Sequence, residues 1–418
     1  MYSLLLYLYQ IGVFLASFFS EKVKKMWQGE QAAFDVLKEK ADKNAEYLWF
    51  HAASLGEFEQ ARPIIESIRK NSPQEKILLT FFSPSGYEVR KNYDCADIIC
   101  YLPLDTPTNA SRFLKLINIK KAYFIKYEFW WNYLHLLQKK NVPTYSVSSI
   151  FREEQIFFKW YGNQYKRVLR CFTHFFVQNE KSRQLLATLG ITNVTITGDT
   201  RFDRVKQIQE QAKVLPVVEQ FIGSTPTKVF IAGSSWQPDE DIFFRYFAEH
   251  PEWKLIIAPH VIGADHLKEI EGKLEKYGMK TVYYKNLENV EMREKPESQR
   301  SALIINCFGL LSSIYRYGDV TYVGGGFGVG IHNVLEAAVW GKPVFFGPNN
   351  QRFQEAQDLK ASGGGLEITS YEDFAAKMDN LIASADKVET LGKAAGDYVS
   401  SRCGATAKVL DATYYKPQ

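Results

Sequence analysis

Several acidic, hydroxyl and imidazole side chains stand directly after short apolar runs of the sequence. Glu57 follows the run EYLWFH at 46–51 and opens a segment in which apolar residues recur with helical spacing. A strand, a turn of small residues and a helix start place this carboxylate at the carboxyl edge of a sheet, where open α/β folds keep their ligands. The helix macrodipole is expected to keep Glu57 ionised, so proton abstraction is the chemistry that it suits.

The turn before Glu57 is made of small residues, HAASLGE. Ser54 stands beside the carboxylate, and Gly56 carries no side chain that would block access to it. The alternative is an ordinary first-turn glutamate, which the macrodipole favours by roughly 0.3–1 kcal/mol. Taken alone, the residue type favours this structural role, and only the place of Glu57 at the sheet edge favours catalysis.

The most distinctive stretch is VTYVGGGFGVGIHNVLEAA at 320–338. An expected strand runs there into three glycines, Gly324, Gly325 and Gly326. Glycine lets the backbone approach a ligand closely, so the N–H groups of these glycines and of a helix N-terminus behind them are expected to be free to bind a phosphate. The spacing is neither that of a P-loop nor G-x-G-x-x-G. A plain glycine-rich turn is the alternative.

The helix behind these glycines is expected to begin near His332 and Asn333. Glu336 would then lie one turn into the helix, near the same face as Asn333, where acidic residues of nucleotide-binding folds accept hydrogen bonds from ribose hydroxyls. The alternative is that Asn333 caps the helix and Glu336 is an ordinary charge in its first turn.

Other polar residues also follow expected strands. They are Ser83, Ser85 and Gly86 in SPSG, Glu128 in YEFWWN, Arg201 in GDTRFD, and Pro259 and His260 in IIAPHV. Each has a structural alternative, namely a helix cap, a paired carboxylate, an ion pair of the arginine with Asp199 or Asp203, and a hydrogen-bonded histidine. Because all are expected at strand ends, where two α/β halves would meet, their shared position favours ligand contact.

The elements that must position these residues alternate along the chain. From residue 46 to about 200, strand-like apolar runs alternate with helix-like runs, and the alternation restarts at KVFIAGS, 228–234. This order is typical of parallel, doubly wound sheets. The sequence therefore predicts an α/β fold with two Rossmann-like halves.

The pattern also predicts where the parts begin and end. They are an apolar segment at 1–20, an N-terminal Rossmann-like domain at 21–212, a linker at 213–225, a C-terminal Rossmann-like domain at 226–395, and a C-terminal helix at 396–418 that packs back on the N-terminal domain. The charged run KNLENVEMREKPESQRS, at 285–301, is expected to be a solvated loop.

Composition excludes several functions. With 418 residues, a net charge of +4 and no long Lys/Arg tract, the chain is not expected to bind nucleic acid. Its five cysteines are scattered without C-x-x-C spacing, which fits reduced thiols in a cytosolic setting. No zinc-spaced Cys/His set and no acidic pair placed beside a diphosphate is identified, so we expect neither a metal nor a cofactor.

The first twenty residues, MYSLLLYLYQIGVFLASFFS, carry no charged side chain. A segment of this length just spans a bilayer, and its tyrosines equally suit a position along the interface. Lys22, Lys24 and Lys25 follow, which favours a cytoplasmic position for the next domain. We expect a membrane anchor, with a core-covering helix as the alternative; no basic region precedes the apolar run, so a signal peptide is not expected.

The motifs occur together, in order, in a known family. The chain carries an apolar N-terminal segment, then SLGE, SPSG, LPLD, YEFWWN, QNE, GDTRFD, and HNVLEAA with a following GP. In this combination it resembles, over nearly its whole length, the Kdo transferases of lipopolysaccharide synthesis, which are family-30 glycosyltransferases of GT-B fold. The resemblance implies two Rossmann-like domains that face each other across a cleft.

The resemblance also implies a reaction. Such enzymes move 3-deoxy-D-manno-octulosonic acid (Kdo) from CMP-Kdo, a substrate and not a cofactor, to the lipid A precursor lipid IVA at the cytoplasmic face of the inner membrane. The family's S-x-G-E glutamate falls on Glu57, as catalytic base, and its E-x-W glutamate on Glu128, as a supporting residue. The H-N-x-L-E segment falls on His332, Asn333 and Glu336, which would hold the cytidine monophosphate.

The donor is then held mainly by the C-terminal half and the acceptor by the N-terminal half, beside an anionic membrane surface. Two departures from the family pattern affect donor contact. His260 stands in Pro-His-Val where many members have Pro-Arg-His, so the arginine near the donor phosphate is missing. Arg201 stands where lysine is frequent, which keeps the charge and changes the geometry.

Two other functions remain open at this point. One is a different GT-B enzyme that uses a UDP-sugar, either a glycosyltransferase or a 2-epimerase, although an epimerase has no reason for an apolar anchor. The other is a membrane-anchored protein without catalytic activity that binds an anionic lipid or nucleotide.

Overall fold

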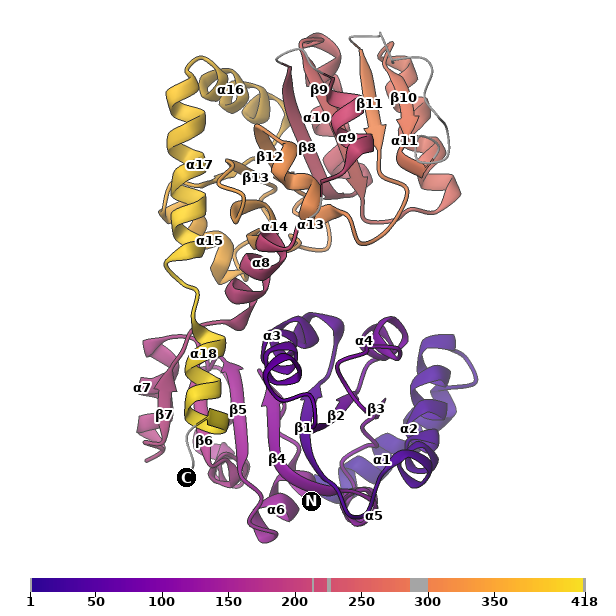
Figure 1. Cartoon of the computed structure of the whole chain (residues 1–418), viewed down its shortest axis with the longest axis vertical. Helices are drawn as coiled ribbons and strands as arrows, with labels where there is room; N and C mark the ends of the chain where they lie inside the picture. The colour runs from indigo at the N-terminus through magenta and orange to yellow at the C-terminus, as the bar shows by residue number, and fades with distance from the viewer. Residues whose placement is uncertain (1, 213, 224–226, 286–299, 416–418) are drawn as a thin grey trace. The chain divides into compact units, whose positions relative to one another are not determined.

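The computed structural model describes residues 2–212, 214–223, 227–285 and 300–415, and these form two compact units (Figure 1). Unit 1 comprises residues 1–204 and 403–418, and unit 2 comprises residues 205–402. Residues 213 and 224–226 of the predicted linker, and most of the predicted charged loop, lie outside the described residues. Each unit contains one parallel sheet, which confirms the predicted α/β class.

The sheet of unit 1 has seven strands in the order β3-β2-β1-β4-β5-β6-β7. These are β1 Glu46–Ala52, β2 Lys76–Phe81, β3 Ile98–Tyr101, β4 Asn118–Ile125, β5 Thr144–Ser149, β6 His174–Val177 and β7 Val194–Ile196. Every residue of β1 except Glu46 is buried, because helices cover both faces of a parallel sheet.

The helices of unit 1 mostly follow strands. They are α1 Tyr2–Ala16, α2 Glu21–Lys40, α3 Leu55–Asn71, α4 Pro84–Arg90, α5 Pro107–Leu116, α6 Trp131–Lys139, α7 Glu180–Thr188, α8 Thr200–Glu210, which runs on into unit 2, and α18 Ala405–Leu410. Several of these helices have a hydroxyl or amide side chain as N-cap. Ser54, Thr106 and Asn179 each accept a hydrogen bond from a backbone N–H of the first turn. The aromatic segment at 156–171 forms short 3-10 helices.

The sheet of unit 2 has the order β10-β11-β9-β8-β12-β13-β14. Its strands are β8 Lys228–Ser235, β9 Trp253–Pro259, β10 Lys280–Tyr283, β11 Ser301–Ile304, β12 Val320–Val323, β13 Val344–Phe346 and β14 Gly365–Glu367. The helices are α9 Pro216–Ile222, α10 Gln237–Glu249, α11 Ala264–Lys276, α13 Leu311–Ile314, α14 Leu335–Ala338, α15 Gln354–Ala361, α16 Tyr371–Ile382 and α17 Ala385–Ser400.

The strand order reverses once in each sheet, and these reversals position the candidate residues. In unit 1 the chain leaves β1 toward β2 and returns to β4 on the other side, so the reversal lies between β1 and β4. In unit 2 the corresponding reversal lies between β8 and β12. Ligands of open α/β sheets bind beyond the carboxyl ends of strands at such switch points.

The apolar N-terminal segment does not form a helix that could span a bilayer, which was one of the two placements expected for an anchor. Helix α1 ends at Ala16, and Ser20 caps the new helix α2, so the 15 residues of α1 extend only about 22 Å, less than the roughly 30 Å hydrocarbon core. Within the described part of the chain, no helix is long and apolar enough to cross a membrane. Tyr2 donates to Asp105 (2.8 Å) and Tyr7 contacts Thr108, which fastens α1 along unit 1.

Candidate functional site

Glu57 lies at the switch point of unit 1, in the first turn of α3 behind β1. Its Oε2 accepts the backbone N–H of Ala53 at 2.6 Å, and its own N–H points to Ser54 Oγ at 3.5 Å. No side-chain ion pair to Glu57 occurs among the residues that the structure describes. A Cβ added at Gly56 would meet nothing within 4 Å, so the space above the turn is open, as predicted.

The electrostatics of Glu57 differ from the sequence-based expectation. The helix start was expected to keep this carboxylate ionised, but burial, and secondly the charge of Glu128, raise its pKa to about 7. The N–H of Ala53 and the charge of Lys126 act in the opposite direction and are outweighed. The result is a carboxyl group that exchanges a proton near neutral pH, as a general base must.

Glu128 follows β4, on the other side of the same switch point. Its Oε2 accepts the indole N–H of Trp130 at 2.5 Å and lies 3.0 Å from Nε2 of His51. Sequence reasoning missed His51 because it is an internal residue of β1 and is completely buried. The structure therefore brings the two predicted carboxyl groups to one site and adds an imidazole beneath them.

The SPSG turn lies beside the Glu57 turn, because the N–H of Ser83 donates to the carbonyl of Ala53 at 2.7 Å. Ser83 Oγ accepts the N–H of Ser85 at 3.3 Å, so these hydroxyls form a helix cap. A Cβ at Gly86 would come within 2.3 Å of the Phe81 ring, which explains this glycine by packing.

Arg201 forms the local ion pair that was considered as its alternative role. Its Nε and Nη2 lie 2.9 and 2.8 Å from Oδ2 of buried Asp199, and Gln60 donates to the other carboxylate oxygen. The ion pair lowers the pKa of Asp199 although burial opposes this. Arg201 thus lies in unit 1 at the start of α8, fastened to its neighbour.

The glycine-rich turn follows β12 at the switch point of unit 2. The N–H groups of Gly324 and Gly325 already donate to Gly233 O (2.9 Å) and to Asp239 Oδ2 (2.8 Å), so these two are not the free phosphate donors that we expected. A Cβ at Gly324 would lie 2.3 Å from Ser234 O, and a Cβ at Gly326 would lie 2.6 Å from a backbone atom of residue 347. Close backbone packing therefore explains both glycines.

Three rings are stacked beside this turn. The rings of His260 and His332 have centroids 4.3 Å apart, and Trp236 stacks on His260 at 4.8 Å. The indole N–H of Trp236 donates to Nε2 of His332 at 3.0 Å, so the proton of neutral His332 is on Nδ1. Burial, and secondly His260, lower the pKa of His332 to about 4, while burial lowers the pKa of His260. Pro259, the last residue of β9, places His260 there.

The helix behind the glycines begins later than predicted. It is α14, which starts at Leu335 and has only four residues, so the expected start near His332 is wrong. Glu336 is held by Ser312 Oγ (2.5 Å) and by the amide of Asn333 (3.1 Å). Asn333 also accepts the N–H of Leu335. Thus the predicted His332, Asn333 and Glu336 do lie in one region of unit 2, near His260.

Two residues of the unit 2 site were not identified from the sequence. Trp236 fixes the tautomer of His332, and buried Asp239 accepts N–H groups from both Trp236 and Gly325. A signal was present, since SSWQPDE directly follows the predicted strand 228–234 and carries a proline typical of a helix start. The same reasoning that singled out residue 260 would have found them.

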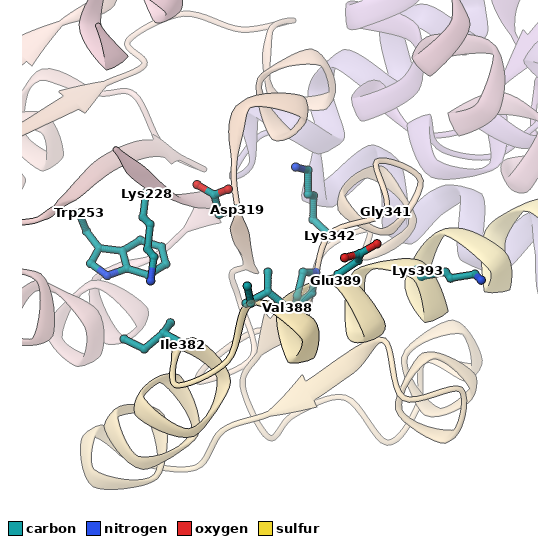
Figure 2. Close-up of a pocket in the computed structure, with 11 residues that line it drawn as sticks. Lys228, Trp253, Asp319, Gly341, Lys342, Ile382, Val388, Glu389 and Lys393 are labelled. Carbon is teal, nitrogen blue, oxygen red and sulfur yellow. The ribbon is translucent and has the colours of Figure 1, made fainter. Parts of the chain in front are cut away.

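A separate cavity of about 520 Å³ lies at the other edge of the unit 2 sheet (Figure 2). Lys228 and Trp253 begin β8 and β9, Asp319 precedes β12, and Lys342 precedes β13, so these lining residues stand at the amino ends of strands. None of the predicted donor-side residues lines it. In the described ranges, no three His, Cys, Asp or Glu side chains gather as a metal-binding group.

Comparison with solved structures identifies the class of fold. The UDP-GlcNAc 2-epimerase of Neisseria meningitidis superposes with a TM-score of 0.61 over 87% of this chain and 98% of its own, at 16% identity. Another UDP-N-acetylglucosamine 2-epimerase superposes with a TM-score of 0.57. The chain thus has a GT-B-like α/β fold with two parallel sheets.

Sequence comparison shows which proteins of known activity the chain is similar to. Residues 28–204 match the family described as 3-deoxy-D-manno-octulosonic-acid transferase (kdotransferase). The 3-deoxy-D-manno-octulosonic acid transferase of Aquifex aeolicus is 27% identical over 85% of this chain and 93% of its own length. The 3-deoxy-D-manno-octulosonic acid transferase of Haemophilus influenzae is 25% identical over 87% of this chain and 86% of its own length. Over most of its length, the chain is thus similar to Kdo transferases, which are glycosyltransferases.

Proposed function

We propose that this glycosyltransferase moves Kdo from CMP-Kdo to a lipid A precursor of the lipid IVA type, with inversion at the anomeric carbon. The observation that carries the proposal is the carboxyl group of Glu57, which lies at a switch point, is open above Gly56 and has a pKa near 7. Such a group accepts a proton at neutral pH, because among the described residues no ion pair with a cationic side chain holds it in its charged form.

Glu57 removes the proton from a primary hydroxyl of the acceptor's glucosamine disaccharide. The hydroxyl oxygen forms a bond to the anomeric carbon of Kdo, the bond from that carbon to the phosphate oxygen of CMP breaks, and CMP leaves with the electron pair. Ser54, the SPSG turn and Glu128 line the acceptor side of unit 1, and Arg201 stands near them with its charge already shared with Asp199.

Unit 2 supplies the donor side. Glu336 accepts from the ribose, while His332 and His260 donate to the anionic part of CMP-Kdo as neutral rings, since the pKa of each is lowered. Neutral N–H donors aimed at a leaving phosphate stabilise the charge that develops there. The arginine frequent in other members is replaced, in this proposal, by the stacked pair of imidazoles.

Helix α1 suits a place at a membrane surface. It exposes a row of large apolar side chains: Leu5, Leu8, Ile11, Leu15 and, just beyond its end, Phe18 and Phe19. Phe19 is 92% exposed, and Lys22, Lys24 and Lys25 follow within one turn or two. We infer that α1 lies in the interface of the anionic cytoplasmic leaflet of the inner membrane, where the lipid acceptor resides.

The test is a transfer assay with purified full-length protein, lipid IVA in mixed micelles and radiolabelled donors. CMP-Kdo is expected to label the lipid, whereas UDP-GlcNAc and UDP-glucose are not. Labelling from a UDP-sugar alone would indicate a different glycosyltransferase, and release of a 2-epimer without lipid would indicate an epimerase. Binding of CMP-Kdo without turnover would indicate a non-catalytic binding protein.

A further inference from the structure

His51 is a buried titratable residue to which the proposed reaction assigns no role. It has no exposed surface, and its two ring nitrogens each meet one polar partner. Nε2 lies 3.0 Å from Oε2 of Glu128, and Nδ1 lies 2.9 Å from the hydroxyl of Thr80. An imidazole enclosed in this way has a defined tautomer, because each partner must complement the nitrogen that it faces.

The tautomer follows from the donors around Thr80. Trp49 is donor only, and its indole N–H donates to Thr80 Oγ1 at 2.8 Å. The proton of Thr80 then has two possible acceptors, His51 Nδ1 at 2.9 Å and the carbonyl of Phe50 at 3.4 Å. The shorter contact directs it to Nδ1, so Nε2 of His51 carries the ring proton and donates to Glu128.

Glu128 therefore receives two N–H donors on one oxygen, from His51 and from Trp130. These two hydrogen bonds fix the position of the Glu128 carboxyl group. The charged groups that face Glu57 are Glu128 and Lys126, with the N–H groups of Ala53 and Ser54 beside them. Burial is the main cause that raises the pKa of Glu57, and the charge of Glu128 is the second.

We propose that His51 is a positioning residue, which donates from Nε2 to Oε2 of Glu128 and holds this carboxyl group at the switch point that it shares with Glu57. This rests on the proposed role of Glu57 in the transfer reaction. The imidazole touches neither substrate; it acts through Glu128, and Thr80 with Trp49 holds its tautomer.

The first test needs no variant that alters the site. In ¹⁵N-histidine-labelled full-length protein, the two ring nitrogens of His51 have distinct chemical shifts, and the signals are assigned by their loss in His51→Gln. The proposal requires Nε2 to be protonated and Nδ1 to be free between pH 6 and 8. A proton on Nδ1 would overturn it.

The second test compares two polar substitutions that differ by one methylene. The amide of His51→Gln reaches the position of Nε2 and retains a donor to Glu128, whereas that of His51→Asn reaches only the position of Nδ1 and Thr80. The titration of Glu57 is followed by ¹³C NMR of labelled glutamate carboxyls, assigned with Glu57→Gln. The midpoint is expected near wild type in His51→Gln and lower by about one pH unit in His51→Asn.

Glu128→Gln should lower the Glu57 midpoint in the same direction, and adding His51→Asn to it should have little further effect. His174→Gln, at the amino end of β6, serves as the histidine control and should leave the midpoint unchanged. If His51→Asn folds and the midpoint stays at the wild-type value, His51 has only a structural role and the proposal is wrong.

The readouts separate this proposal from the proposed function. The titrations require no substrate. They therefore test whether the titration midpoint of Glu57 depends on His51 even if the protein does not transfer Kdo. Where transfer is measurable, His51→Asn should shift the acid limb of the pH profile of kcat to lower pH with KM little changed. A uniform loss of activity at every pH would contradict the proposal.

Discussion

In unit 1, burial raises the pKa of Glu57 to about 7, whereas in unit 2 burial lowers the pKa of His332 to about 4. Both shifts have one cause, since a low-dielectric environment disfavours the charged form of either group. The consequences differ because the groups differ. A carboxyl becomes a proton acceptor poised near neutral pH, and an imidazole becomes a permanently neutral hydrogen-bond donor and acceptor.

The two sites occupy equivalent places in similar sheets, beyond the carboxyl ends of the strands at the switch point. Unit 1 gathers two carboxyl groups there, and unit 2 gathers two imidazoles and an indole. The comparison teaches that the topology selects the place, while the side chains beyond the strands select the chemistry. The experiments below would break or sharpen this contrast.

The largest effect is expected from Glu57→Ala. Loss of a general base lowers the rate by about 10²–10⁴-fold, so Kdo transfer should fall by at least this factor while binding of CMP-Kdo stays close to wild type. Transfer is measured with lipid IVA, and binding by calorimetry. Glu180→Ala, an exposed first-turn glutamate of α7, is the matched control and should retain full activity. Near-normal turnover of purified Glu57→Ala would remove Glu57 from the base role.

Glu336→Ala should act on the other site and change binding instead. Loss of an acceptor to the ribose is expected to weaken the affinity for CMP and CMP-Kdo by about 10–100-fold, the usual worth of a hydrogen bond to a charged group. Calorimetry with CMP measures this. Glu372→Ala, in the first turn of α16, is the control on an exposed helix start of the same unit. An unchanged CMP affinity would contradict the donor-side assignment.

Glu57→Gln should stabilise the protein at alkaline pH. The folded pKa of about 7 lies above the ordinary glutamate pKa of 4.5, so folding disfavours ionisation, and this cost develops as pH rises from about 4.5 to 7. The amide removes the cost, and the free energy of unfolding should rise by about 1–2 kcal/mol at pH 8 and change little below pH 4.5. Denaturant unfolding at both pH values, with Glu180→Gln as control, measures it. A stabilisation equal at both pH values would not come from ionisation.

The smallest effect on stability is expected for His332→Gln. The stability contributed by this site changes at acid pH and in the opposite direction to that of Glu57. Its folded pKa of about 4 lies below the ordinary histidine pKa of 6.5, so the contribution of this site to stability is complete above pH 6.5 and is lost as pH falls toward 4. His332→Gln should flatten this acid-side loss by about 1 kcal/mol, with little pH dependence left from this site. Thermal unfolding from pH 7 to pH 4.5 measures the slope, and His250→Gln is the control in the same unit. An unaltered slope would show that His332 is not held neutral by the fold.

Much of the fold was predictable because its signals are local. The alternation of apolar runs and helix-like runs predicted two parallel sheets, and the run of small residues before Glu57 predicted a turn that Ser54 caps. A strand end is visible in a sequence, so the residues that follow strands were correctly placed at the sheet edges. Glu57 and Glu128 are 71 positions apart in the sequence (128 − 57 = 71). They lie at the same switch point because each follows one of the two strands that flank it.

What failed depended on contacts between distant residues. The N–H groups of Gly324 and Gly325 were expected to be free, but Gly233 and Asp239 accept them. The helix expected at His332 begins at Leu335. A helix spanning the bilayer was one of two placements expected for the apolar N-terminal segment, but α1 ends at Ala16, and Tyr2 and Tyr7 attach it to other parts of unit 1. The hydrophobic periodicity of a segment does not reveal which distant residues will contact it.

The order of residues by itself determined the class of fold, the place of Glu57 behind the end of a strand, and the resemblance to Kdo transferases, because periodicity, turn composition and motif order are properties of the chain. Only the tertiary structure decided which protonation state each site favours. That depends on how deeply a group is buried and on which charge faces it, and Glu128, His51, Trp236 and His260 meet their partners only after the strands have assembled.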